Sequence, residues 1–359
     1  MQRIQKIRSI LEEKQIDAIL IKSRSNKRYL GALTGSGVKV LVTRDELYQI
    51  MDGRYSNEAR ETTSGFIPVV HEQGNSYLDE VVRLLGSHAR IGIEAGQVLV
   101  KEYLSMQEYG LKTVLLEHEL EEARRCKDAQ EIALVRKACE ITDAIFQETI
   151  STIRIGMKET EVSALLQYLA IKNGASAMAF DTIVASGVRG SMPHGRPSEK
   201  TFEAHEFITI DFGITYQGYQ SDMTRTVCIQ EPKPELKKIY DIVLEAQCAG
   251  VDFIKAGIRG NDVDSYVRGI IQGHGYGPYF THGLGHGIGM GDGDLPLLNA
   301  GSDTVLEEGM IMSCEPGIYV PGLGGVRIED DVLIENGRGV PLNATTKELI
   351  ILEGNGYEV

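Results

Sequence analysis

The chain has 359 residues, of which 42% are hydrophobic and 25% charged, and its formal net charge is −14. A chain of this length predicts about two domains, and its apolar content excludes a mainly disordered protein. The excess of acidic residues argues against binding to nucleic acid or to anionic membranes, because both require clustered Lys and Arg.

The five cysteines form no CxxC pair and are odd in number, which predicts free thiols in a reducing compartment. No apolar segment reaches the roughly 18 to 20 residues of a membrane span. The N-terminus also lacks the apolar stretch of a secretion signal. We therefore expect a cytoplasmic protein with no membrane partner.

The first 120 residues alternate short helical and strand-like patterns. Ile4, Ile7 and Ile10 recur at helical spacing. Strand-like runs follow at 17–21, 38–42, 47–51 and 90–93, and a helical pattern covers 77–85. This alternation predicts a small α/β domain. It holds no cluster of ligand-type side chains, so we expect a scaffold, a pocket wall or a partner surface.

The charged segment 117–128 is a predicted connector, which places the domain boundary near residue 123. A long helical pattern begins at Asp128, and a second covers 159–172 and ends at the stop signal Asn173-Gly174. Strands, two further helices over 234–255 and 261–272, and more strands complete the chain. We predict an α/β (α+β) protein with domains 1–122 and 123–359.

The first candidate site element is a pair of strand-like arms, each carrying one aspartate. Asp211 lies in the run 208–213 and Asp222 in the run 219–227, and Tyr216-Gln217-Gly218 offers a hairpin turn. A loop with an even number of residues places both carboxylates on one face, whereas an odd loop places them on opposite faces. Like charges so close together are unfavourable unless a cation lies between them.

The second element is a pair of glutamates. Glu315 follows the strand-like run 310–314, and Glu329 lies within a second run that follows a glycine-rich loop at 321–325. An odd-length loop would place both carboxylates on one face. Arg327 lies two residues before Glu329 on that face, where it either orients the carboxylate or anchors a carboxylate of the substrate.

The third element, 281–289, carries His282 and His286 among four glycines. This glycine content argues against a zinc-binding helix, and the spacing is not that of a dinucleotide-binding loop. Glycine lets another group approach the backbone closely. His194, in a separate Pro-His-Gly segment, is a further candidate. Two aspartates, two glutamates and at least one histidine form a ligand set for two divalent metal ions. Oxygen-rich ligation favours Mn²⁺, with Co²⁺ or Zn²⁺ as alternatives.

These motifs resemble the pita-bread metallopeptidases, in particular the prolidase (Xaa-Pro dipeptidase) and aminopeptidase P group. The matching segments lie in the family's order over about residues 125–335: Phe180–Gly187, Pro193–Gly195, Asp211–Gly213, Ser221–Thr226, His282–Gly289, Glu315–Tyr319 and Gly325–Asp330. The resemblance implies a creatinase-like N-terminal domain (1–122) followed by a pita-bread dimetal catalytic domain (123–359). It also implies a homodimer and a small peptide as substrate.

The resemblance also implies individual roles. Asp211 would bind one metal ion, His286 and Glu315 the other, and Asp222 and Glu329 would bridge the two. Glu315 would also accept a proton from the attacking water. His194 and His282 would contact the substrate around the scissile bond. The implied activity is hydrolysis of an Xaa-Pro peptide bond, with an Xaa-Pro dipeptidase as the leading assignment.

One position departs from the family pattern. The family has a His-acid pair seven and eight residues after the metal-binding histidine, and here these positions are Gly293 and Asp294. The missing imidazole leaves alternatives open. They are an Xaa-Pro aminopeptidase, a related amidohydrolase, or a metal-binding homologue of low activity.

Overall fold

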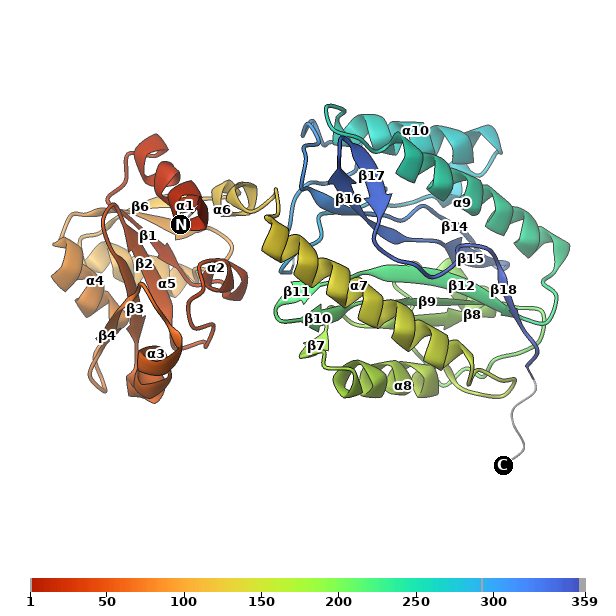
Figure 1. Ribbon diagram of the computed structural model, residues 1–359, viewed down its shortest axis with the longest axis horizontal. Coiled ribbons are helices and arrows are strands. Elements are labelled where there is room, and N and C mark those ends of the chain that lie inside the picture. The colour runs from red at the N-terminus through yellow and green to blue at the C-terminus, as the bar shows by residue number, and fades with distance from the viewer. Residues whose placement is uncertain (1, 292, 355–359) are drawn as a thin grey trace. The chain divides into compact units, whose positions relative to one another are not determined.

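The computed structural model describes residues 2–291 and 293–354 of the chain (Figure 1). The chain divides into two compact units, residues 1–124 and residues 125–359. Within the described residues, no helix is both long enough and apolar enough to cross a membrane.

The N-terminal unit is built on a six-stranded sheet with the order β4-β3-β2-β1-β5-β6. Strand β1 pairs antiparallel with β2 and parallel with β5. The strands are β1 (Ala18–Ile21), β2 (Lys39–Thr43), β3 (Leu47–Met51), β4 (Ile67–Val70), β5 (Arg90–Glu94) and β6 (Lys112–Leu116). The helices are α1 (Gln2–Glu13), α2 (Arg24–Tyr29), η1 (Gly53–Tyr55), α3 (Ser56–Thr62), α4 (Tyr77–Leu85), α5 (Val100–Glu108) and α6 (Glu119–Ala123). The expected α/β alternation is therefore confirmed.

Helix α4 illustrates why this unit folds as it does. Ser76 and Asp79 form a reciprocal capping box at its start, which satisfies backbone donors that have no partner inside the helix. Leu78 and Val81 are buried and pack into the core of the sheet. The segment expected to be only a connector contains a short helix, α6, whose Leu120 is also buried. One buried apolar side chain in a charged segment is too weak a pattern to predict a helix.

Over residues 125–291 and 293–354, the C-terminal unit contains the longer helices and four small sheets. Its helices are α7 (Ala129–Ile150), α8 (Glu159–Lys172), η2 (Gly187–Ser191), α9 (Pro234–Phe253), α10 (Gly260–Gly273) and η3 (Gly277–Tyr279). Its first strands are β7 (Ala177–Met178), β8 (Ile183–Ser186), β9 (Phe207–Phe212), β10 (Ile214–Tyr216), β11 (Tyr219–Gln220) and β12 (Met223–Ile229). Its last strands are β13 (Ile311–Cys314), β14 (Gly317–Val320), β15 (Gly324–Arg327), β16 (Asp330–Glu335), β17 (Arg338–Pro341) and β18 (Ile350–Leu352).

Two hydrophobic cores position the strands that carry the candidate site. Helices α7 and α8 pack on the sheet β18-β12-β9-β8. Helices α9 and α10 pack on the sheets β13-β16-β17 and β14-β15. In Figure 1, α8 and the pair α9–α10 lie on opposite sides of the strands. The strands between them are buried on both faces, which is why their sequence runs are so apolar.

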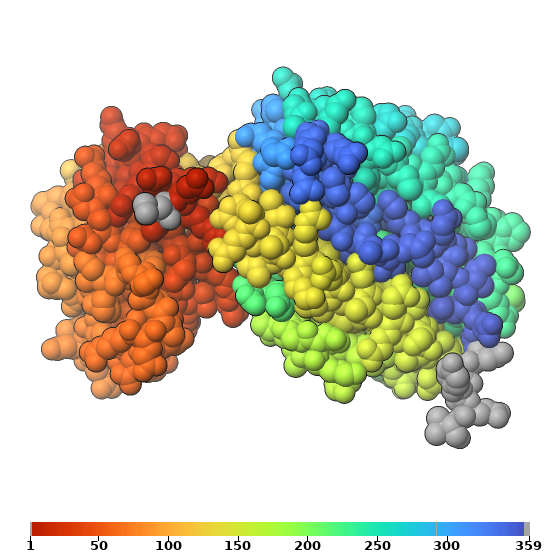
Figure 2. All heavy atoms as spheres, viewed as in Figure 1, coloured from red at the N-terminus to blue at the C-terminus, as the bar shows by residue number. Residues whose placement is uncertain are grey.

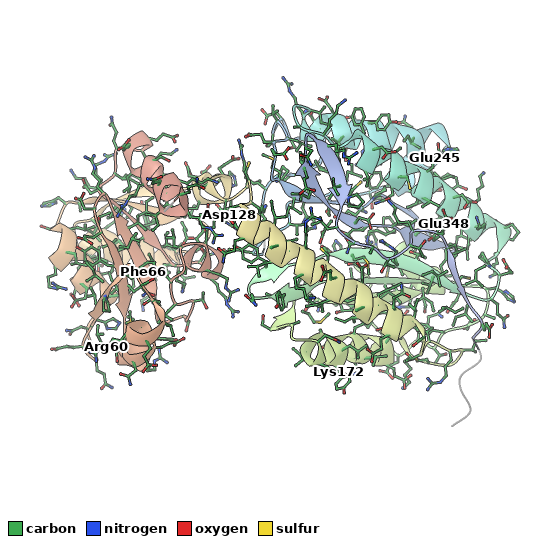
Figure 3. All side chains as sticks on the ribbon, viewed as in Figure 1. Arg60, Phe66, Asp128, Lys172, Glu245 and Glu348 are labelled. Carbon is green, nitrogen blue, oxygen red and sulfur yellow. The ribbon has the colours of Figure 1, made fainter. Side chains whose placement is uncertain are left out.

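Helix α7 connects distant parts of this unit. Asp128, labelled in Figure 3, caps its first turn by accepting from the backbone of Glu131. Further along, Asp143 accepts hydrogen bonds from the backbone of Ala344 and Thr345, about 200 residues later in the chain. In Figure 2 the yellow surface of α7 lies beside the blue surface of the C-terminal part of the chain. The helix thus fixes the C-terminal segment against the sheets.

Candidate metal centre

The two aspartates lie on one β-hairpin. Asp211 in β9 pairs with Thr224 in β12, and Tyr216 pairs with Tyr219 at the end of the same ladder. The loop therefore has two residues, Gln217 and Gly218, and both have positive φ, as a type I′ turn requires. This even-length loop confirms the arrangement that places Asp211 and Asp222 on one face, diagonally opposed.

The two glutamates lie where a second antiparallel pair ends. Strand β13 pairs with β16 so that Cys314 is the partner of Asp330. Glu315 comes directly after Cys314, and Glu329 comes directly before Asp330. The β14–β15 connection has three residues, 321–323, which is the odd length that the sequence pattern requires for both glutamates to share a face. The prediction that Glu329 lies within a strand is wrong, because it lies between β15 and β16. Its N–H donates to Thr224 O at 3.1 Å, and this bond directs the chain from one hairpin to the next sheet.

His286 presents one ring nitrogen to these carboxylates. Its Nδ1 lies 3.1 Å from the carbonyl oxygen of Gly287. Because a carbonyl only accepts, Nδ1 carries the proton and Nε2 offers a lone pair. Nε2 lies 3.5 Å from Asp222 Oδ2 and 3.5 Å from Glu315 Oε1. Ser313 Oγ donates to Glu315 Oε1 and accepts from the His286 N–H, each at 3.0 Å.

The glycines around His286 are needed for packing. A Cβ on Gly285 would lie 2.1 Å from Ser313 O, and one on Gly287 would lie 2.4 Å from the backbone carbon of Asp294. Neither position has room for a side chain. The expectation that these glycines permit a close approach is confirmed. The approaching groups are the protein's own backbone on both sides of His286.

Four buried carboxylates of the described residues each keep one oxygen without a hydrogen-bond partner: Asp331, through its Oδ1, and three candidate metal ligands. The three ligand atoms are Asp211 Oδ1, Asp222 Oδ1 and Glu329 Oε1. Ligand atoms of Asp222, His286 and Glu329 all lie within 4.8 Å of one another. Burial, and next the charge of Glu329, raises the pKa of Asp222 far above its ordinary value. Buried like charges with unsatisfied oxygens fit a divalent cation as their missing partner.

Arg327 is fully committed to this centre. Its Nη2 donates to Asp211 Oδ2 at 2.5 Å and its Nε to Thr224 Oγ1 at 3.1 Å. Its Nη1 donates to the Tyr319 hydroxyl at 2.8 Å and to Pro193 O at 3.3 Å. Each of the three nitrogens therefore has a protein acceptor. This geometry favours the orienting role, directed at Asp211, over an anchor for a substrate carboxylate.

His282 is held between two protein groups. Its Nδ1 lies 2.7 Å from Gly283 O and its Nε2 lies 2.8 Å from the Tyr319 hydroxyl. The ring also packs edge-on against Phe280. Burial lowers the pKa of His282, which favours the neutral ring. The neutral ring donates to the Gly283 carbonyl and accepts from Tyr319, so both nitrogens are used within the protein.

All eight candidate residues line one cavity of about 720 Å³. They are Asp211, Asp222, His286, Glu315, Glu329, His194, His282 and Arg327. His194 comes from the loop after η2, and its side chain is exposed. Gly293 lies on the same wall with φ of +82°, and a Cβ there would meet no atom within 4 Å.

The sequence reasoning missed the residues that hold the ligands in place. Asp331 is fully buried, and its Oδ2 accepts from the Asp222 N–H at 2.9 Å and from Cys139 Sγ at 3.2 Å. Burial raises the pKa of Asp331 to about 7. Thr224 Oγ1 donates to Glu329 Oε2 at 2.6 Å. A third consecutive acid at the start of an apolar strand was the available signal for Asp331.

Comparison with known families agrees with this geometry. Metallopeptidase family M24 matches residues 133–336, and the creatinase/prolidase N-terminal domain matches residues 3–126. The chain therefore belongs to metallopeptidase family M24, with a creatinase/prolidase domain at its N-terminus. The resemblance found in the motifs, the expected fold class and the assignment as a metallopeptidase are confirmed.

Individual relatives are similar over nearly the whole chain. A Pyrococcus horikoshii protein named Xaa-Pro dipeptidase is 38% identical over 355 residues, covering 97% of this chain and 99% of the relative. A solved Xaa-Pro dipeptidase from Bacillus anthracis is 41% identical with a TM-score of 0.93, covering 98% and 99% of the two chains. A solved X-Pro aminopeptidase from Thermotoga maritima is 35% identical with a TM-score of 0.88, covering 98% and 100%.

Proposed function

We propose that this protein is a metal-dependent dipeptidase that hydrolyses the peptide bond before proline. The observation that carries this proposal is the set of buried candidate ligands Asp211, Asp222 and Glu329, each with one unsatisfied oxygen, of which Asp222 and Glu329 have ligand atoms within 4.8 Å of a ring nitrogen of His286. The similarity to Xaa-Pro dipeptidases supports the substrate class. Asp211, His286 and Glu315 would hold the two ions, and Asp222 and Glu329 would be shared between them.

The chemistry combines a metal centre with positioned side chains. Two bound divalent ions, Mn²⁺ in this proposal, supply Lewis acidity and lower the pKa of bound water. Glu315, oriented by Ser313, accepts the proton of the attacking water. His194 contacts the substrate from its exposed loop. Both ring nitrogens of His282 are bonded within the protein, to Gly283 and Tyr319. His282 therefore contacts the substrate by packing of its ring and not by a hydrogen bond.

The test is hydrolysis of Ala-Pro by purified protein with added Mn²⁺ and with EDTA, beside elemental analysis of the same sample. We expect turnover that EDTA abolishes and Mn²⁺ restores, with about two ions per chain. Ala-Ala serves as the matched peptide without proline. Metal-loaded protein that cleaves Ala-Ala as fast as Ala-Pro would contradict the proline requirement.

A second candidate is an Xaa-Pro aminopeptidase, which the similarity to the Thermotoga maritima structure supports. Preference for Ala-Pro-Ala over Ala-Pro would favour it. A related amidohydrolase would cleave neither peptide. A metal-binding homologue of low activity is favoured by Gly293, which leaves one wall of the cavity without an imidazole. Slow cleavage of Ala-Pro by fully metal-loaded protein would support that alternative.

We further propose a cytoplasmic homodimer. Cys139, Cys228, Cys248 and Cys314 are free thiols, which suits a reducing compartment. Light scattering on the purified full chain measures the oligomeric state directly, and a mass near 39.5 kDa would contradict the dimer.

A further inference from the structure

An exposed ion pair lies at the wall of the cavity. Arg196 Nη2 and Asp181 Oδ2 are 2.7 Å apart, and the two side chains are 79% and 75% exposed. Both residues line the same cavity as the metal-ligand candidates. Arg196 follows His194 by two residues on one loop, and both residues line this cavity. This pair has no part in the metal centre described above.

The loop that carries Arg196 is held firmly at its backbone. Glu159, fully buried in α8, accepts from Arg189 Nε at 3.1 Å and from the Ser198 N–H at 3.0 Å. Arg189 Nη2 in turn donates to the backbone oxygen of Arg196 at 2.6 Å. The main chain at Arg196 is therefore anchored to a buried carboxylate, while its side chain extends into solvent. Such an arrangement presents a charge without a large loss of loop entropy on binding.

The other positive groups of the cavity wall are already engaged. Among the described lining residues, the arginines are Arg196 and Arg327 and there is no lysine. Arg327 is 3% exposed, and each of its nitrogens donates to a protein acceptor. The two ring nitrogens of His282 are likewise bonded within the protein. Arg196 is thus the permanent positive charge of this wall that solvent, and a substrate, can reach.

We propose that Arg196 binds the terminal carboxylate of the substrate and thereby selects dipeptides. This inference rests on the proposed function. An exposed ion pair contributes little to stability, so a substrate carboxylate can displace Asp181 at small cost. A planar guanidinium can then bind both carboxylate oxygens. A peptide longer by one residue carries its carboxylate about 3.5 Å further from the scissile bond, beyond the same contact.

The test compares three substrates that share the Ala-Pro bond: Ala-Pro, Ala-Pro amide and Ala-Pro-Ala. For the Arg196→Ala variant, we expect KM for Ala-Pro to rise about tenfold, the loss of one charge-assisted carboxylate contact. Its KM for Ala-Pro amide and for Ala-Pro-Ala, and its kcat for all three substrates, stay within about twofold of the wild type. Arg196→Lys recovers part of the loss, because the charge returns without the planar fork.

Two further variants sharpen the result. Asp181→Asn frees the guanidinium, so KM for Ala-Pro falls while KM for the amide is unchanged. Arg136→Ala is the matched control. Arg136 on α7 also forms an ion pair, with Glu335, but it does not line the cavity, so both KM values stay unchanged. If Asp181→Asn instead raises KM for Ala-Pro amide, Asp181 binds the amino group of the substrate. That result would overturn the proposal that the substrate carboxylate replaces Asp181 on Arg196.

Failure of this inference is distinct from failure of the proposed function. Suppose that the wild-type protein cleaves Ala-Pro, but that Arg196→Ala changes KM equally for Ala-Pro and for Ala-Pro amide. This result overturns only the role of Arg196. If metal-loaded wild-type protein cleaves none of the peptides, the proposed function fails. Calorimetric dissociation constants for Ala-Pro and Ala-Pro amide then decide the role of Arg196, and equal values in wild type and variant, or no binding at all, overturn it.

Discussion

The N-terminal unit and the metal centre of the C-terminal unit bury negative charge in opposite ways. In the N-terminal unit, buried Glu94 accepts from the Lys22 N–H, the Ser23 N–H at 2.9 Å and Asn26 Nδ2 at 2.8 Å. In the C-terminal unit, Asp222 and its neighbouring carboxylates keep oxygens for which no donor exists among the described residues. A buried charge with a full set of donors serves the fold. Converging carboxylates without donors are a cost to the fold and mark where a ligand belongs.

The largest expected effect comes from the C-terminal unit. Asp222→Asn removes a proposed bridging ligand, so hydrolysis of Ala-Pro falls by at least about 10³-fold, the equivalent of several kcal/mol of transition-state stabilisation. Metal content falls as well. In EDTA, however, the variant melts at a higher temperature than the wild type, because one of several repelling carboxylates is gone.

Melting curves in EDTA and in Mn²⁺ check the expected rise in melting temperature of the metal-free variant. Elemental analysis checks the expected loss of bound metal. The exposed Asp252 on α9 provides the matched control, since Asp252→Asn leaves metal content and both melting temperatures unchanged. A lower melting temperature for Asp222→Asn in EDTA would show that Asp222 stabilises the metal-free fold. In that case the contrast between the units would not hold.

The matching change in the N-terminal unit has the opposite character. Glu94→Gln places an amide N–H₂ where three donors converge, so at least one of them loses its acceptor. The expected cost is about 1–3 kcal/mol of unfolding free energy, with no change in metal content and the same loss in EDTA and in Mn²⁺. Urea unfolding followed by circular dichroism measures it. The exposed Glu46→Gln is the control, and an equal loss in that variant would contradict the special role of Glu94.

The sequence predicted the residues of the metal centre better than the contacts that support them. Asp211 and Asp222 were predictable, because strand alternation and a two-residue turn fix which face each carboxylate takes. The same logic placed Glu315 opposite Glu329. It failed for the local structure of Glu329, since the break between β15 and β16 depends on a backbone bond to Thr224 from another hairpin.

Contacts between distant segments were beyond the sequence. Asp331 binds the backbone of Asp222 over 109 positions, and Arg327 binds Asp211 over 116. The donors of Glu94 lie about 70 positions away. Pattern periodicity reports only which face of its own element a residue takes. The pairing of two faces is set by tertiary packing, and no local signal encodes it.

Gly293 tests how far the C-terminal unit has departed from full activity. Gly293→His adds an imidazole to the cavity wall where a Cβ meets no atom within 4 Å. We expect kcat on Ala-Pro to rise up to about tenfold, below the 10²–10³ typical of a well-placed donor. The positive φ of +82° strains any side chain there, so the melting temperature falls modestly. Metal content stays unchanged.

The matched variant for this position is Gly293→Ala, which carries the same backbone strain without an imidazole. A rate gain in the histidine variant alone assigns the effect to the ring. Equal rates in the two variants, with folded and metal-loaded protein, would mean that another group already stabilises the transition state or that the natural substrate is not an Xaa-Pro peptide.

The smallest expected effect is a pH dependence of stability in the N-terminal unit. Lys27 is buried, and its Nζ donates to Gly35 O at 2.8 Å and Val38 O at 3.0 Å. Burial, and next the charge of Lys39, lowers the pKa of Lys27 to about 8, whereas an unfolded lysine titrates near about 10.4. Between these values the unfolded chain binds a proton that the folded chain has released.

Stability therefore rises with pH across this window, by at most about 1.4 kcal/mol per pH unit. The Lys27→Met variant lacks this rise, and the difference in slope between the two proteins removes contributions from other titrating groups. The midpoint of urea unfolding, followed from pH 7 to 10.5, measures this slope. The relevant transition is the one that Glu94→Gln shifts, because Glu94 lies in the same unit as Lys27. Parallel slopes would mean that the two carbonyl acceptors keep the ammonium charged despite burial. The N-terminal unit would then satisfy its buried cation as completely as its buried Glu94, and the contrast with the metal centre would be sharper still.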